Sequence, residues 1–161
     1  MKDEIAAQVG GALEMLENAI RACPESLWGD ASRNPQFWYL AYHTIFYADV
    51  YFSPGDKDFK PPPPYTLSEF DRSGPMPDRV YTKDEMLAYL DHGRRKLRSL
   101  MAEWTEDRAR ERLEFGSIKG TRFETLMYTL RHIQHHAAQL NLLLRLVTDS
   151  APRWVVRATK T

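Results

Sequence analysis

Residues 123–145 read FETLMYTLRHIQHHAAQLNLLLR, and this stretch has the most regular hydrophobic pattern in the chain. Its apolar residues recur alternately four and three positions apart, which is the spacing of a helix packed lengthwise on other helices. They form a seam that extends just beyond the stretch: Leu126, Leu130, Ile133, Ala137, Leu140, Leu144 and Val147. The pattern predicts a long amphipathic helix from about Thr121 to Val147.

Two other stretches have the same spacing. The first is predicted to be helical over residues 2–22 and to end before Pro24, because proline disfavours a helical residue in front of it. Its seam is Ile5, Val9, Ala12, Leu16, Ala19 and Cys23. The second begins at Thr82, which forms a capping-box pattern with Glu85. Its seam is Met86, Leu90, Gly93, Leu97, Leu100 and Trp104. Gly93 either lets a neighbouring helix approach closely or leaves space for a ligand.

A fourth helix is predicted over residues 35–52, PQFWYLAYHTIFYADVYF, with Pro35 at the first helical position. This stretch contains a single formal charge, Asp49, and is apolar on two faces. One face carries Trp38, Ala41, Ile45, Ala48 and Phe52, and the other carries Leu40, His43, Tyr47 and Val50. Such a helix is usually buried on most sides, so periodicity does not tell which face points into the core.

The connections complete an all-α fold, a four-helix bundle over residues 1–149 with a basic tail over residues 150–161. Residues 53–81 are rich in proline and predict a long crossover between parallel helices 2 and 3, although loops of this length also carry functional sites. Residues 105–121 are polar and suggest a short helix or a turn of strand. Trp154, Val155 and Val156 suggest that part of the tail docks on the bundle.

Composition excludes several classes of function. The chain has 161 residues, with 22 basic and 22 acidic side chains, so its formal net charge is zero and it lacks the basic excess of a nucleic-acid binder. Its start carries acidic residues without an apolar core, and no stretch is long and apolar enough to cross a membrane. One cysteine, Cys23, rules out an internal disulfide and suits a reducing compartment. We therefore expect a cytoplasmic protein that binds neither nucleic acid nor membrane.

Three of the five histidines lie within RHIQHHAAQ on the last predicted helix. At about 100° per residue, His136 lies about 70° and His132 about 110° from the centre of the seam, on one side, while His135 lies almost opposite. His132 and His136 therefore form an i, i+4 pair, the spacing with which one helix chelates one metal ion. Such pairs are also common on helices without any ligand, where they are structural or solvated.

A metal would need a third ligand from another helix, and His43 is the obvious candidate. The alternative is a core histidine that is hydrogen-bonded to a carbonyl or a tyrosine. His92 lies beside charges and is expected to be solvated. HIQHH lacks the glutamate of the metalloprotease HExxH motif, and Cys23 has no neighbouring motif of a nucleophile.

These residues resemble a known family. A histidine in a W-x-x-x-x-H helix (Trp38 to His43), a proline-bearing crossover and a final H-x-x-x-H-x-x-Q (His132 to Gln139) are similar to the DinB/YfiT-like superfamily. The resemblance extends from about residue 5 to 147. It implies an up-up-down-down bundle of four helices with a mononuclear metal held by His43, His132 and His136.

The resemblance also implies an activity. Members with an assigned activity are thiol transferases, isomerases or hydrolases, so we expect a metal-dependent enzyme that activates a small thiol or water for reaction with a small-molecule substrate. Zinc, nickel and iron(II) suit imidazole ligands. A low-molecular-weight thiol is an expected second cofactor. Gln139 is a candidate for orienting a ligand or bound water, and Tyr47 for donating a proton or a hydrogen bond.

An alternative of a different class is a non-catalytic bundle with a structural metal or none, which acts through dimerisation or a protein partner. Tyr128, Leu142 and Leu146 lie on the face of the last helix away from its seam. If exposed, they would form an apolar patch suited to a homodimer contact.

Overall fold

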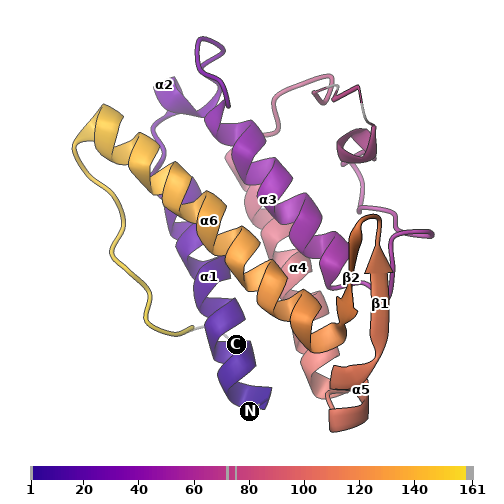
Figure 1. Ribbon diagram of the computed structural model, residues 1–161. Helices are drawn as coiled ribbons and strands as arrows, with labels where there is room; N and C mark the ends of the chain where they lie inside the picture. Colours follow the sequence, from indigo (N-terminus) through magenta and orange to yellow (C-terminus); the bar gives the residue numbers. More distant parts are fainter. Residues whose placement is uncertain (1, 72, 75, 159–161) are drawn as a thin grey trace.

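The structure is a computed structural model that describes residues 2–71, 73–74 and 76–158, and it is mostly helical (Figure 1). The elements, in chain order, are α1 (Lys2–Ala22), α2 (Glu25–Trp28), α3 (Phe37–Tyr51), η1 (Ser68–Phe70, a short 3₁₀-helix), α4 (Lys83–Ala102), α5 (Glu106–Arg110), β1 (Arg112–Phe115), β2 (Ile118–Thr121) and α6 (Arg122–Thr148). An all-α class is therefore confirmed. None of the described helices is both long enough and apolar enough to cross a membrane.

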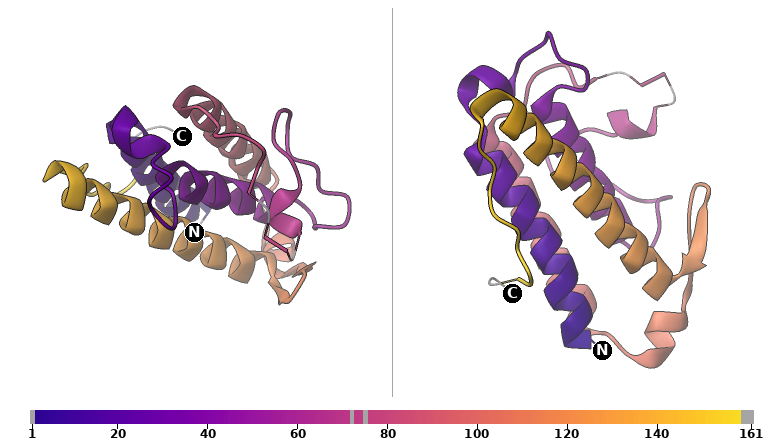
Figure 2. Two further views of the ribbon diagram at one scale, coloured as in Figure 1. Left: turned by 90° about the horizontal axis from the view of Figure 1, so that it is seen from above. Right: turned by 60° about the vertical axis from the view of Figure 1, so that its left-hand side comes forward.

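The four long helices, α1, α3, α4 and α6, pack side by side (Figures 1 and 2). Trp28 Nε1 donates a hydrogen bond to the Tyr81 carbonyl oxygen over 2.9 Å, which places the start of α4 beside α2, just beyond the end of α1. The Tyr51 and Tyr128 rings lie 5.3 Å apart, which places the end of α3 beside the start of α6. Hence α1 and α6 point one way, and α3 and α4 point the other way.

The helix directions are therefore up-down-down-up, and the predicted up-up-down-down order is wrong. The reason lies in the connections. An up-up-down-down order needs two long crossovers, but only the segment between α3 and α4 returns along the molecule. The segment before α3 folds at one end around α2, and the segment before α6 folds at the other end into α5 and two strands. The predicted long crossover joins the second and third long helices, α3 and α4, and these two helices run parallel. This prediction is confirmed.

The seams of α1 and α6 bury the residues that their spacing predicted, apart from Leu130 and Val147 of the α6 pattern. All six seam residues around α1 are buried. In α6, Leu126, Ile133, Ala137, Leu140 and Leu144 are buried, whereas Leu130 is half-buried and Val147 is 39% exposed. Val147 lies in the last turn of α6, where the helix projects past the core. Thr121 caps α6 with a capping box that includes Glu124.

Helix α3 begins later than predicted. Gln36 is its N-cap, with an extended backbone (φ −70°, ψ 147°), so Pro35 precedes the helix instead of occupying its first position. The face with Trp38, Ala41, Ile45 and Ala48 is fully buried. On the other face, His43 and Tyr47 are half-buried. That second face is the one that carries the candidate site.

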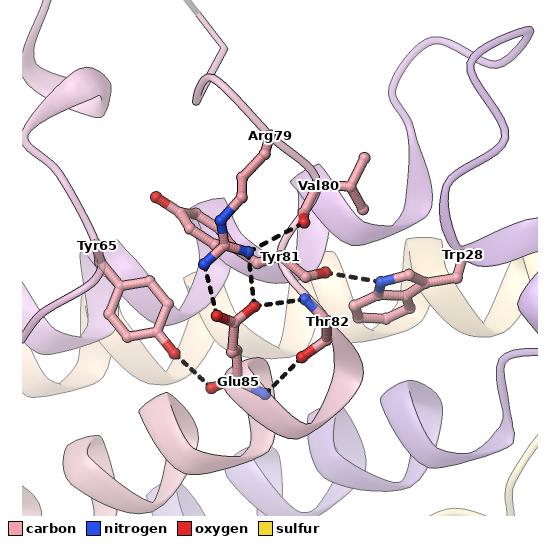
Figure 3. Close-up of polar contacts among 7 residues, drawn as sticks. All are labelled: Trp28, Tyr65, Arg79, Val80, Tyr81, Thr82 and Glu85. Atoms are coloured by element: carbon pink, nitrogen blue, oxygen red, sulfur yellow. Dashed lines mark hydrogen bonds and ion pairs between the residues drawn. The ribbon is translucent and has the colours of Figure 1, made fainter.

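Hydrogen bonds attach the crossover between α3 and α4 to both of these helices. Thr82 and Glu85 form the predicted capping box of α4, and Arg79 donates two hydrogen bonds to the Glu85 carboxylate (Figure 3). The Tyr65 hydroxyl donates to the Glu85 carbonyl oxygen at the same place. Further back, the Tyr47 hydroxyl donates to the Glu69 carbonyl oxygen over 2.9 Å. These contacts hold η1 against the exposed side of α3.

A β-hairpin joins α5 to α6, so residues 105–121 contain both the short helix and the strand that their sequence suggested as alternatives. Strands β1 and β2 pair antiparallel, from Arg112 opposite Thr121 to Phe115 opposite Ile118. Leu113 and Phe115 are buried, and alternate residues of β1 are exposed. Gly116 opens the turn with φ +56°, a conformation that side chains other than glycine's disfavour. The strands are only four residues long, which is too short for their alternation to stand out in the sequence.

A buried charge connects α3 to α4. The Asp49 side chain is 0% exposed and pairs with Lys96, while Tyr89 donates a hydrogen bond to it over 3.0 Å. His92 Nε2 lies 3.4 Å from the same carboxylate. His92 is therefore half-buried, and the expectation that it is simply solvated is wrong. It was misassigned because its partner lies more than forty positions away in the sequence.

The seam of α4 differs from its prediction near the C-terminus. Tyr89 and Met101 are buried, whereas Leu100 is half-buried and Trp104 lies beyond the end of the helix at Ala102. Gly93 is buried, yet a Cβ atom built on it would meet no other residue's heavy atoms within 4 Å. Close approach of a neighbouring helix is therefore not the reason for this glycine.

The tail runs back along α1 as far as it is described (Figure 2). The Ala158 amide donates to the Ala7 carbonyl oxygen over 3.0 Å, and Val155 packs against the core. A Cβ on Gly10 would lie 2.8 Å from the Ala158 Cβ, so glycine permits this contact. Part of the tail therefore docks, as predicted, but Trp154 and Val156 do not take part, since they are 65% and 76% exposed. Residues 159–161 of the predicted tail lie outside the described residues.

Candidate metal centre

Three histidines converge between α3 and α6. His43 comes from α3, and His132 and His136 come from consecutive turns of α6. The ring centroids are 5.4 Å apart for His43 and His132, 5.0 Å for His43 and His136, and 4.6 Å for His132 and His136. One nitrogen from each ring lies within 4.8 Å of the other two. This group could hold a metal ion.

Helix geometry accounts for the convergence. Residues four apart share a face of a helix, so His132 and His136 project to the same side of α6. Helices α3 and α6 run antiparallel, with the end of α3 beside the start of α6. The middle of α3 therefore lies beside the middle of α6, and His43 faces His132 and His136 there. His135 is exposed, as the helical angles predicted, and takes no part in the group of three.

Two of the histidines are held by a neighbouring side chain. His43 Nδ1 lies 2.7 Å from Glu69 Oε2, and the Glu69 side chain is 4% exposed. His136 Nδ1 lies 2.7 Å from Gln139 Oε1. A carboxylate or amide oxygen accepts a hydrogen bond here, so Nδ1 carries the proton in both rings and Nε2 keeps its lone pair. Metal-binding histidines characteristically have such a partner on the other ring nitrogen.

These contacts revise the roles expected for two polar residues. Gln139 accepts the hydrogen bond of His136 and so orients that histidine. The Tyr47 hydroxyl donates its hydrogen bond to the Glu69 carbonyl oxygen, and the centroids of the Tyr47 and His43 rings are 4.9 Å apart. Tyr47 thus fixes the crossover and the His43 ring in place. Burial, and next the negative charge of Glu69, raises the pKa of Tyr47 above its usual range.

Glu69 was missed by the reasoning from sequence. It lies 26 positions after His43, in a crossover without any periodic pattern, so no local spacing connects the two residues. The only signal is an acidic residue between Leu67 and Phe70 in a proline-rich loop. Folding of the crossover onto α3 brings Glu69 to the site.

Burial favours the neutral form of His132 and His136. It lowers the pKa of His132 to about 3, with smaller contributions from His136 and His43, and it also lowers the pKa of His136. His132 Nε2 is buried and has no hydrogen-bond partner among the described residues. A buried polar atom without a partner is costly, and a metal ion would satisfy it. Three imidazoles, each with a ring nitrogen within 4.8 Å of the other two, therefore fit zinc, nickel or iron(II).

The centre opens onto a cleft. No carboxylate, cysteine or further histidine of the described residues joins the group of three, which leaves coordination positions for other ligands. His43 and His132 line a cleft of about 480 Å³ between α3, α6, the crossover and the hairpin turn. An ion held there would be accessible to a small molecule, as in catalytic rather than structural zinc sites.

Cys23 is excluded as a nucleophile by its surroundings. It is 2% exposed, and burial raises the pKa of its thiol to about 12. A thiol with such a pKa is almost never a thiolate near neutral pH, so Cys23 packs as a small apolar residue.

Comparison with known proteins identifies no family, so the assignment of a function rests on the geometry of the three histidines. No family model matches the chain, and no curated protein is significantly similar to it.

Proposed function

We propose that the chain is a metal-dependent enzyme on a DinB/YfiT-like four-helix bundle, which activates a small thiol or water for attack on a small electrophile. The observation that carries the proposal is the group His43, His132 and His136, two members of which line a cleft and which no fourth described histidine, cysteine or carboxylate joins. A structural site would instead be closed by a fourth protein ligand.

A divalent ion bound to three neutral imidazoles lowers the pKa of a bound water or thiol and so supplies a nucleophile near neutral pH. The chain's own residues fix the geometry. Glu69 and Gln139 hold the rings of His43 and His136, and Tyr47 keeps η1 against α3. The side chains lining the cleft exclude bulk water and orient the electrophile. Calcium and magnesium fit poorly because they prefer oxygen ligands.

The nucleophilic sulfur of this proposal comes from a soluble thiol, since Cys23 is buried. A small thiol requires a reducing compartment, and a chain with one buried cysteine suits the cytoplasm. In the transfer, the thiol loses its proton to solvent, its sulfur forms a bond to the electrophilic carbon, and the leaving group departs with the electron pair.

A transfer assay tests this function. The zinc-, nickel- or iron-loaded protein should conjugate a bacterial low-molecular-weight thiol to a chloroaromatic electrophile, and chloride release measures the rate. The activity should disappear on removal of the metal and in His43→Ala. If the rate of chloride release were the same with and without metal, for every thiol and for water, the proposed metal-dependent activity would be refuted.

A second candidate is a non-catalytic homodimer, favoured by one specific observation. Leu142 and Leu146 on α6 are 56% and 72% exposed, which is unusual for leucines on neighbouring turns. If α6 forms a dimer contact, Leu142→Glu with Leu146→Glu should lower the mass by light scattering from a dimer to a monomer. Val156→Glu, at an equally exposed residue in the tail, is the control. A monomeric wild-type protein would contradict this candidate.

A further inference from the structure

The cleft beside the three histidines has an unusual lining. Its wall is largely aromatic, with Tyr47, Tyr51, Phe70, Phe115 and Tyr128. Two acidic residues, Asp56 and Asp71, stand on its rim, in addition to the buried Glu69. Among the described lining residues there is no lysine or arginine. The cleft therefore combines π-systems with negative charge that no lysine or arginine among its described lining residues offsets.

The aromatic wall is assembled from four separate elements, α3, η1, β1 and α6. The Tyr51 ring from α3 meets Phe115 from β1 edge-on at 5.6 Å and Tyr128 from α6 edge-on at 5.3 Å. These contacts bring the hairpin turn close to the candidate metal centre, because Tyr51 also lies 6.1 Å from His132. A molecule bound to the ion would therefore lie against these rings.

Both rim carboxylates are held in place by hydrogen bonds. Asp56 Oδ2 accepts a hydrogen bond from the Gly116 amide over 2.8 Å, which holds it at the hairpin turn. Asp71 accepts hydrogen bonds from the amide and the hydroxyl of Ser73, and these lower its pKa. Lys119 of the hairpin is paired with Glu114 at 2.7 Å, and Lys57, next to Asp56 in the chain, lines the neighbouring pocket and not this cleft.

We infer that the cleft takes a small amine, a molecule with a metal-binding group at one end and a positive charge at the other, and that it rejects anionic substrates. This inference deepens the proposed function and rests on it, since the ion would bind one end of the same molecule. Cations are attracted to aromatic faces and to carboxylates, whereas an anion would meet two like charges. A thiol or electrophile with an amino group fits the cleft better than one with several carboxylates.

Hydroxamates that differ only in one distal group test this selectivity. Benzohydroxamate and its 4-aminomethyl and 4-carboxy derivatives share the group that binds the ion and the aromatic ring. Calorimetric titration of the zinc-loaded protein should show that the amine binds about tenfold more tightly than the carboxylate, with the parent compound between them. Binding is measured directly, so the experiment does not depend on the reaction that the protein catalyses.

Variants assign the selectivity to the rim. Asp56→Asn with Asp71→Asn should reduce the preference to about threefold or less, and asparagine keeps an oxygen acceptor for Gly116. Asp58→Asn is the matched control, because Asp58 is exposed on the same segment and does not line this cleft. It should leave the preference unchanged.

The outcomes separate the two claims. Equal affinities for the three compounds, or a preference for the carboxylate, would overturn the inference and leave the metal centre standing. Zinc-loaded protein that binds none of the three would overturn the proposed function, and the inference with it. A preference that survives loss of both rim carboxylates would show that these residues do not select the amine.

Discussion

His132→Ala should abolish tight metal binding while leaving the protein folded. His132 supplies one of three imidazoles, and its Nε2 is buried without a partner among the described residues. Loss of a direct ligand should weaken binding by more than the roughly 10–100-fold that follows loss of a residue that only orients a ligand. Equilibrium dialysis against zinc, followed by elemental analysis, measures the bound metal. Circular dichroism checks that the variant is folded.

Two further variants test whether the loss of zinc binding is specific to His132. Glu69→Gln removes a carboxylate that holds His43 but is not itself in the group of three, so zinc affinity should fall by about 10–100-fold without being lost. His135→Ala is the matched control, because His135 is an exposed histidine on the same helix. Full zinc binding by His132→Ala, or an equal loss in His135→Ala, would rule out the proposed ligand set.

Asp49→Ala should be the most destabilising single change outside the candidate centre. Asp49 is fully buried, and the substitution removes the carboxylate that pairs with Lys96 and accepts the Tyr89 hydrogen bond. Among the described residues, Lys96 then keeps only uncharged acceptors, the carbonyl oxygen of residue 49 and Ser53 Oγ. Removing one member of a buried ion pair, together with a buried hydrogen bond, costs about 3–5 kcal/mol. Urea denaturation followed by circular dichroism measures the loss in the free energy of unfolding.

The exposed pair of Asp91 and Arg95 on α4 provides the comparison. Both side chains are more than half exposed, so Asp91→Ala should change the free energy of unfolding by no more than about 0.5 kcal/mol. If Asp49→Ala cost as little as Asp91→Ala, the buried network would not be what holds α3 to α4.

The histidine group could be anticipated from sequence because its main constraint is local. His132 and His136 lie one turn apart, and their angle to the seam follows from the helical repeat alone. His43 could be named only as the histidine of another helix, since no spacing relates α3 to α6. Glu69 could not be found, because it reaches His43 through the folding of an aperiodic crossover.

The same distinction explains the fold. The helices α1, α4 and α6 follow from hydrophobic spacing and capping residues, which act over a few positions. The burial of His92 beside Asp49, the hairpin before α6 and the up-down-down-up directions depend on partners far away in the sequence. Short strands such as Arg112–Phe115 are stabilised by their packing on α6 and α3, which no local pattern records.

X-ray absorption at the zinc edge of the zinc-loaded protein tests the central claim most directly. A catalytic centre of His43, His132 and His136 predicts three imidazole nitrogens at about 2.0–2.1 Å and at least one oxygen from water. The spectrum should lose one imidazole in His43→Ala. A sulfur ligand, fewer than three imidazoles, or a shell closed by four protein ligands would contradict an open three-histidine centre.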